Sequence, residues 1–165
     1  MNATLFALGA IALWATLASL GVALAHVPPF LLTGLALVIG SVPAWPLARS
    51  WRVPHFPTAA VGLFGLVSGA LALLCHLAFE PAVSLSARDW MLIVLTGLGP
   101  LGAAFFLWDA ALKRGDARRI GILSYLTPLA SPLLLVATTG RPLTIWVAVA
   151  AVLIVGAAIA GMRAR

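Results

Sequence analysis

Charged residues are scarce in this sequence. Only 8% of its 165 residues are Asp, Glu, Lys or Arg, four of them acidic, whereas 63% are hydrophobic. Soluble globular domains carry about 25% charged residues. The composition therefore excludes an ordinary soluble domain and predicts an integral membrane protein.

Residues that hold metals or form disulfides are equally rare. Cys75 is the single cysteine, so neither a disulfide within the chain nor a thiolate metal site can form. A carboxylate near the centre of an apolar run would mark a proton relay or cation site, but none of the four acids lies there. No metal and no cofactor are expected.

Nucleophile and base pairs suited to an intramembrane protease are also missing. Ser68 and His76 approach a serine protease pattern, but eight residues separate them by about 12 Å along one helix. That distance excludes a nucleophile and its base in hydrogen-bond contact. An aspartyl protease would need two acids within spans, so the sequence predicts no enzyme.

Long apolar runs fill almost the whole chain. A span needs about 20 residues to cross roughly 30 Å of hydrocarbon, and glycine, proline and charged residues mark the breaks between runs. No Lys or Arg precedes the first run, which favours a retained helix over a cleaved signal. The expected class is an all-α polytopic membrane helix bundle, a single transmembrane domain over residues 1–165. Its expected spans are about 3–25, 29–48, 57–79, 90–112, 119–138 and 142–162.

The basic residues fall on alternate ends of these runs. Eight of the ten gather on one side, and only Arg88 and Arg141 lie on the other. The positive-inside rule then predicts that both termini are cytoplasmic, and this placement argues against nucleic-acid binding. Six charged residues fall between Asp109 and Arg119, where Asp109 and Lys113 are one turn apart and can pair. We expect this segment to anchor the fourth and fifth spans in the cytoplasm, through Asp109, Lys113, Arg114, Arg118 and Arg119.

Glycine and hydroxyl residues define two helix faces. Gly62, Gly65 and Gly69 share one face of the third span with His76, which predicts close helix packing there. Ser124, Thr127 and Ser131 share a face of the fifth span, which predicts that this face points at protein or a polar cavity.

Prolines interrupt the fourth and fifth spans at mid-membrane depth. Pro100, Pro128 and Pro132 each remove a backbone donor there. Interrupted spans are typical of transporter binding sites, and the three prolines are expected hinges.

Two stretches resemble a known family. They are FFLWDAALKRGDARRIGILSYLTPLASPLLLV in the second half and, less specifically, AIALWATLASLGVALAHVPPFLLTGLALVIG at the start. Both resemble the drug/metabolite transporter superfamily, within its EamA group, and most closely its aromatic amino acid exporters of the YddG type. The resemblance implies a bacterial inner-membrane carrier with ten helices in two inverted repeats.

This chain is much shorter than such a carrier. Residues 1–64 resemble family helices one to three, and residues 66–165 resemble helices seven to ten. The third span would then be a composite joined near residues 64–68, and helices four to six would be absent. Because both joined parts run from the cytoplasm outward in the family, every later helix keeps its orientation.

The resemblance also implies a function and its residues. It predicts export of aromatic amino acids or related amphipathic metabolites by alternating access, with an aromatic solute as the small-molecule partner in a lipid bilayer. The residues carried over as substrate-binding are Trp14, Phe106, Trp108, Tyr125, Thr127 and Ser131. Action as a single chain or as a homodimer stays open. The alternative is a non-transporting remnant that forms only a packed helical unit.

Overall fold

The computed structural model describes residues 2–42, 59–140 and 144–163. These residues form helices, and no strand occurs in them, so the predicted all-α class is confirmed. The helices are α1 (Ala3–Ala15), α2 (Leu17–Ala23), α3 (Pro29–Ser41), α5 (Ala59–Phe79), α6 (Ala87–Leu98), η1 (Gly99–Ala103), α7 (Ala104–Arg114), α8 (Ala117–Leu123), η2 (Ser124–Leu126), α9 (Thr127–Thr139) and α10 (Ile145–Arg163).

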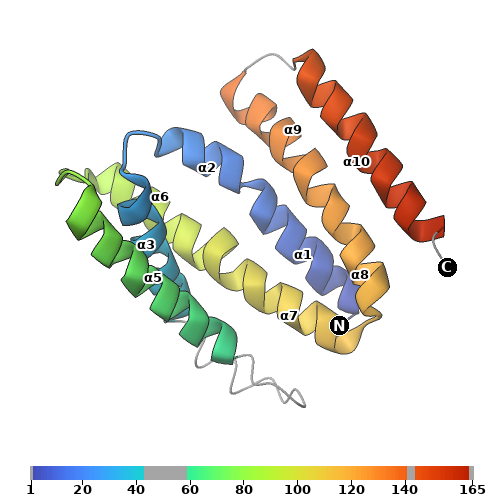
Figure 1. Cartoon of the computed structure of the whole chain (residues 1–165), viewed down its shortest axis with the longest axis horizontal. Helices are drawn as coiled ribbons and strands as arrows, with labels where there is room; N and C mark the ends of the chain where they lie inside the picture. The colour runs from blue at the N-terminus through green and yellow to red at the C-terminus, as the bar shows by residue number, and fades with distance from the viewer. Residues whose placement is uncertain (1, 43–58, 141–143, 164–165) are drawn as a thin grey trace.

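Neighbouring helices form a row across the molecule (Figure 1). The order runs from α10 to α9, then to α1 with α2, then to the α6–η1–α7 rod, and on through α3 to α5. Both termini lie toward the end of the bundle at which α7 turns into α8. The α6–η1–α7 rod therefore has α1 on one side and α3 on the other.

Four helical stretches are long and apolar enough to cross a bilayer. They are Ala3–Ala23, Ala60–Phe79, Ala87–Arg114 and Ala117–Thr139, and two shorter apolar helices are Pro29–Ser41 and Ile145–Ala157. Parts of the predicted spans 29–48, 57–79 and 142–162 lie outside the described residues. The count of six and the orientation remain predictions.

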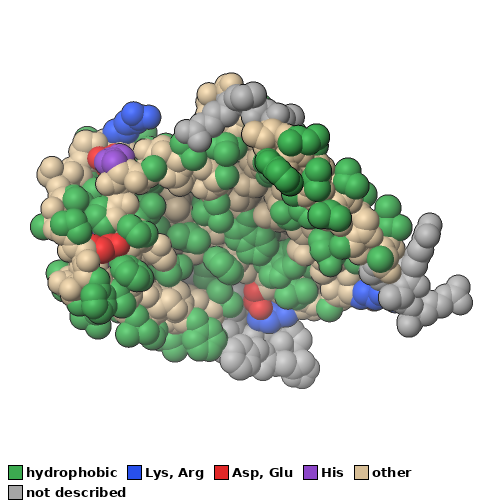
Figure 2. Space-filling view, turned by 45° about the horizontal axis from the view of Figure 1, so that its top comes forward, with side chains coloured by type: hydrophobic (Ala, Val, Ile, Leu, Met, Phe, Trp, Pro, Cys, Tyr) green, Lys and Arg blue, Asp and Glu red, His purple; other side chains and the backbone are tan. Residues whose placement is uncertain are grey.

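Apolar side chains cover much of the outer surface (Figure 2). On α10, for example, Trp146 is 77% exposed and Val152 is 72% exposed, and on α5 Leu77 is 78% exposed. Such a surface is stable only in contact with lipid or with other apolar protein. Together with the apolar helices it defines a multi-pass membrane protein.

Glycines bring α3 into close contact with helices on both of its sides. A Cβ added to Gly69 would lie 3.0 Å from the carbonyl oxygen of Gly34, and one added to Gly65 would lie 2.5 Å from Ser41 Oγ. On the opposite side, a Cβ on Gly40 would overlap the carbonyl oxygen of Gly97. The predicted packing role of the third-span glycine face is confirmed for Gly65 and Gly69.

The first predicted span is divided at Thr16, which the sequence analysis missed. The Thr16 hydroxyl donates to the Leu13 carbonyl at 2.7 Å, and α1 ends there before α2 begins. Threonine hydroxyls that bond back to the preceding turn often bend helices. The bend adds an interruption to those expected at the prolines.

Candidate functional site

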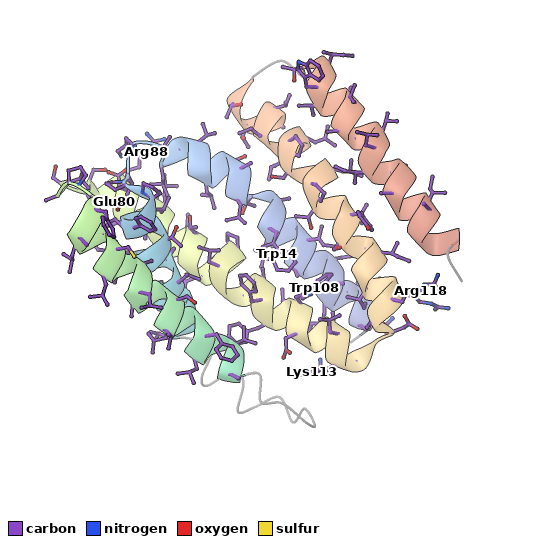
Figure 3. All side chains as sticks on the ribbon, viewed as in Figure 1. Trp14, Glu80, Arg88, Trp108, Lys113 and Arg118 are labelled. Carbon is purple, nitrogen blue, oxygen red and sulfur yellow. The ribbon has the colours of Figure 1, made fainter. Side chains whose placement is uncertain are left out.

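An aromatic cluster joins α1 to α7. The ring of Trp14 lies 5.3 Å from that of Trp108 and 5.5 Å from that of Phe105, measured between centroids, and it meets Phe105 edge to face. Figure 3 shows Trp14 and Trp108 between these two helices. The structure thus brings together two of the substrate-binding residues that the resemblance implied, and it adds Phe105.

A groove of 650 Å³ lies on the same side of the α6–η1–α7 rod. Its walls come from α1 and α2, from α6 and η1, and from α9. They are almost wholly apolar, but the hydroxyl residues Thr16, Ser19 and Thr138 are part of the lining, and the Ser19 and Thr138 hydroxyls lie 2.9 Å apart. The size is that of a small-molecule site.

A π-helical turn forms part of this groove. The segment η1 spans Gly99–Ala103, and Pro100, one of the expected hinges, lines the groove. Short π-helical turns inside α-helices occur frequently at functional sites. Trp108 lies five residues beyond Ala103 in the same rod, about 7.5 Å along the axis, so the aromatic cluster adjoins one end of the groove.

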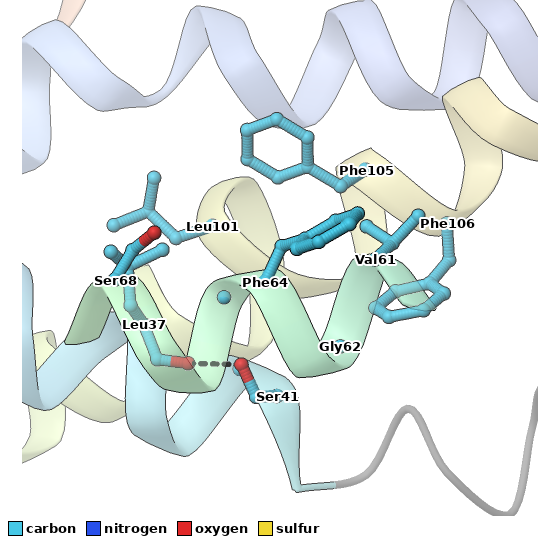
Figure 4. A pocket seen from close by; sticks show the side chains of 11 residues that line it. Leu37, Ser41, Val61, Gly62, Phe64, Ser68, Leu101, Phe105 and Phe106 are labelled. Carbon is cyan, nitrogen blue, oxygen red and sulfur yellow. Dashed lines mark hydrogen bonds between the residues drawn. The ribbon is translucent and has the colours of Figure 1, made fainter. Parts of the chain in front are cut away.

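Phe106 belongs to a different cavity. This cavity, of 340 Å³, lies between α3, α5 and the η1–α7 segment (Figure 4). Phe105 lines it too, and the neighbouring Phe106 is only 6% exposed. The structure therefore separates Phe106 from the groove that lies on the other side of the rod.

The remaining implied residues lie on η2 and α9. Tyr125 is 38% exposed, and the Thr127 hydroxyl is buried without a hydrogen-bond partner in the described part of the chain. Ser124 donates to the Gly121 carbonyl at 2.6 Å, whereas Ser131 is half-buried. Among the hydroxyls of α9, Thr138 is the one that lines the 650 Å³ groove.

Two of the expected hinges lie beside α10. Pro128 and Pro132 line a cavity of 250 Å³ between α9 and α10, whose other lining residues are all apolar. Pro128 is in the first turn of α9, where a missing N–H costs little, and Pro132 is inside the helix. The hinge roles of Pro128 and Pro132 are untested.

The basic segment between α7 and α8 is built from local contacts. Lys113 Nζ lies 2.6 Å from Asp109 Oδ2, so the predicted ion pair is present. The guanidinium of Arg114 lies 4.7 Å from the ring centre of Phe6, and Asp116 caps α8 by accepting the N–H of Arg119 at 2.9 Å. Arg118 and Arg119 are exposed. In Figure 3, Lys113 and Arg118 lie at the end opposite Arg88.

At the opposite end of the bundle, the carboxylate of Glu80 holds the start of α3, a contact that the sequence did not predict. Glu80 accepts the N–H groups of Phe30 at 2.8 Å and Leu31 at 3.1 Å, at the start of α3. His76 Nδ1 lies 2.8 Å from Glu80 Oε2, so the imidazole has a hydrogen-bond partner. Burial raises the pKa of the Glu80 carboxyl, but these hydrogen bonds and the charge of His76 outweigh it and hold the pKa below its ordinary value.

Glu80→Gln should lower the melting temperature in detergent by about 2–4 °C at pH 7. A carboxylate at a helix start stabilises it through the free N–H groups and the helix dipole. Because the folded pKa is lowered, this contribution is complete above the ordinary carboxyl range and is lost as the pH falls through the folded pKa. The difference between wild type and variant, measured by thermal unfolding, should therefore shrink in acid. Asp116→Asn should change little, since that exposed cap can accept the Arg119 N–H through the amide oxygen alone, whereas Glu80 uses both carboxylate oxygens. Equal losses for both variants would contradict the assignment.

These features define a helical membrane protein. Its apolar groove, lined in part by hydroxyl residues, lies beside an interrupted helix, as in membrane transporters. The EamA-like transporter family matches residues 44–161, well over half of the sequence, and the chain belongs to this family. The family is one of transporters, in agreement with the expectation that the chain is no enzyme.

Two further similarities extend beyond the family match. The "Aromatic amino acid exporter YddG" of Ancylobacter novellus is 42% identical over 146 residues, which are 88% of this chain and 50% of that protein. This chain thus spans about half the length of that curated relative. A solved structure described as "Crystal structure of protein" matches with a TM-score of 0.75 and 25% identity over 94% of this chain and 95% of its own. A chain of about this length thus has the same fold.

Proposed function

We propose that this chain exports aromatic amino acids, or related amphipathic compounds, across the bacterial inner membrane by alternating access. The observation that carries the proposal is the 650 Å³ groove at the π-helical turn Gly99–Ala103. Interrupted spans that line a cavity are the expected position of a transporter's substrate site. The substrate class is that named for the Ancylobacter novellus relative.

The groove offers both kinds of contact that such a substrate needs. Its apolar walls accept an aromatic ring, and Trp14 and Trp108 provide ring faces at the adjoining end. Hydroxyl groups of Thr16, Ser19 and Thr138 supply polar contacts. None of the residues that line the groove is charged, so the amino and carboxylate groups of the substrate depend on these hydroxyls and on water that enters with it.

The interrupted helices provide the conformational change of transport, and the basic segment between α7 and α8 sets the orientation of the chain in the membrane. Pro100 lies within the π-helical turn, so a change of this turn would shift α6 relative to α7. Pro128 and Pro132 give α9 a similar freedom next to α10. The basic residues between α7 and α8 hold that end in the cytoplasm, with six spans and both termini inside. A homodimer would close the open side of the groove.

Transport in proteoliposomes tests the proposal. Purified protein should move labelled phenylalanine or tryptophan across the bilayer at a rate several-fold above that of protein-free liposomes. A non-aromatic amino acid such as lysine should move no faster than in protein-free liposomes. Correctly inserted protein without flux of any aromatic amino acid would refute export and favour the alternative, a packed helical unit that does not transport.

A further inference from the structure

The 340 Å³ cavity is separate from the groove to which export is assigned. It lies over the C-terminal end of α3, between the first half of α5 and the η1–α7 segment (Figure 4). The rod that contains η1 stands between it and the groove, since Leu101 faces the cavity whereas Pro100 faces the groove. The cavity is therefore a second candidate binding site.

Three aromatic rings form part of its walls. Phe64 comes from α5, and Phe105 and Phe106 come from α7, so rings face the space from two helices. Aromatic groups favour edge-to-face or offset contact with another ring, which adds to the gain from burying apolar surface. A flat ring makes these contacts with several walls at once, as a flexible alkyl chain does not.

The hydroxyl of Ser41 can act toward a ligand only as a hydrogen-bond acceptor. Ser41 is 4% exposed, and its hydroxyl donates to the Leu37 carbonyl at 2.6 Å, as the dashed line in Figure 4 marks. Because the hydroxyl hydrogen is used, the Ser41 oxygen can only accept a further hydrogen bond. Ser68 supplies a second hydroxyl at the wall. A ligand that contacts Ser41 must therefore carry an N–H or O–H donor.

Charged groups find no partner on the walls that are described. The residues lining the cavity are apolar apart from Ser41 and Ser68, and none of these lining residues is charged. An ammonium or carboxylate group moved from water into such surroundings loses its hydration without compensation. A zwitterionic amino acid is thus poorly suited to this cavity.

We infer that the cavity binds small uncharged aromatic compounds with a single N–H or O–H donor, such as an indole or a phenol. The ring lies among Phe64, Phe105 and Phe106, and the donor reaches Ser41 Oγ. This binding site is distinct from the proposed export groove, and its occupancy does not depend on transport.

Equilibrium binding of labelled indole to the purified protein in a neutral detergent tests the inference. Indole should bind about 2- to 10-fold more tightly than 1-methylindole, which lacks the N–H group, as one hydrogen bond predicts. Ser41→Ala should remove that difference, whereas Ser124→Ala in η2, away from the cavity, should keep it. Tryptophan, which is zwitterionic, should fail to displace indole.

A cavity-filling variant separates binding at this place from partition into the micelle. Val61→Phe adds a ring to the wall and should abolish saturable indole binding while the protein keeps its elution volume and melting temperature. Unchanged indole binding by Val61→Phe would overturn the inference, and so would displacement of indole by tryptophan. Both results are read from binding alone, so they are distinguishable from a failure of amino acid flux in liposomes.

Discussion

Gly40→Ala should destabilise the protein more than any other single-methyl addition tested on its helices. A Cβ at Gly40 would overlap the carbonyl oxygen of Gly97 and approach the Cα of Gly102 to 3.0 Å. Both neighbours are backbone, so relief requires α3 to move away from the α6–η1–α7 rod. Overpacking costs about 1–3 kcal/mol, and we expect the upper end of that range. Thermal unfolding in detergent measures the loss.

Gly21→Ala is the matched control. Gly21 is exposed on α2, and a Cβ there would meet nothing within 4 Å. Replacing glycine by alanine inside a helix gains about 0.8–1.0 kcal/mol in propensity, so this variant should be equal to or more stable than wild type. If Gly40→Ala behaved like Gly21→Ala, α3 and the rod would not be in contact in the membrane protein.

The contrast between these glycines shows what sequence patterns can and cannot predict. Spacing along one helix placed Gly65 and Gly69 on a common face, and the structure has them against α3. Spacing gives no information on which partner a helix meets. The contact of Gly40 with Gly97 joins residues 57 positions apart, so only the arrangement of helices reveals it.

The same limit applies to the candidate site. The resemblance implied that Phe106 and Trp108 both bind substrate, yet these residues, two positions apart, face different surroundings. Phe106 faces the 340 Å³ cavity, and Trp108 contacts Trp14. Helical geometry alone predicts such divergence, since residues i and i+2 do not share a face. The roles of Tyr125, Thr127 and Ser131 as substrate contacts stay predictions.

Polar contacts between residues far apart in the chain also could not be predicted from the sequence. Glu80 directly follows an apolar helix, and its carboxylate accepts hydrogen bonds from the start of α3, 50 residues earlier. The signal was present in part: Pro28 and Pro29 mark a helix start whose free N–H groups require acceptors. Which acid serves them depends on the α3–α5 packing that the glycines permit.

The α6–η1–α7 rod connects these observations to function. Its π-helical turn presents Pro100 to one space and Leu101 to the other, so a return to α-helical register would rotate the residues on one side of the turn by roughly one position. Gly97 and Gly102 hold the rod against Gly40 of α3, and α1 packs along its α7 half. Such a rotation would change the positions of Phe105 and Trp108 relative to Trp14.

Trp108→Ala should therefore reduce aromatic amino acid flux at least about tenfold, which corresponds to about 1.4 kcal/mol of lost interaction. It removes the ring that contacts Trp14 at 5.3 Å between centroids, and so takes away both the stacking surface that we propose for substrate and a contact between α1 and α7. Trp108→Phe keeps a ring and should retain most of the flux. Trp146→Ala is the matched control, since Trp146 is 77% exposed on α10, and proteoliposome flux should not change. Equal flux from Trp108→Ala and Trp146→Ala, at equal amounts of inserted protein, would show that substrate does not pass the aromatic cluster.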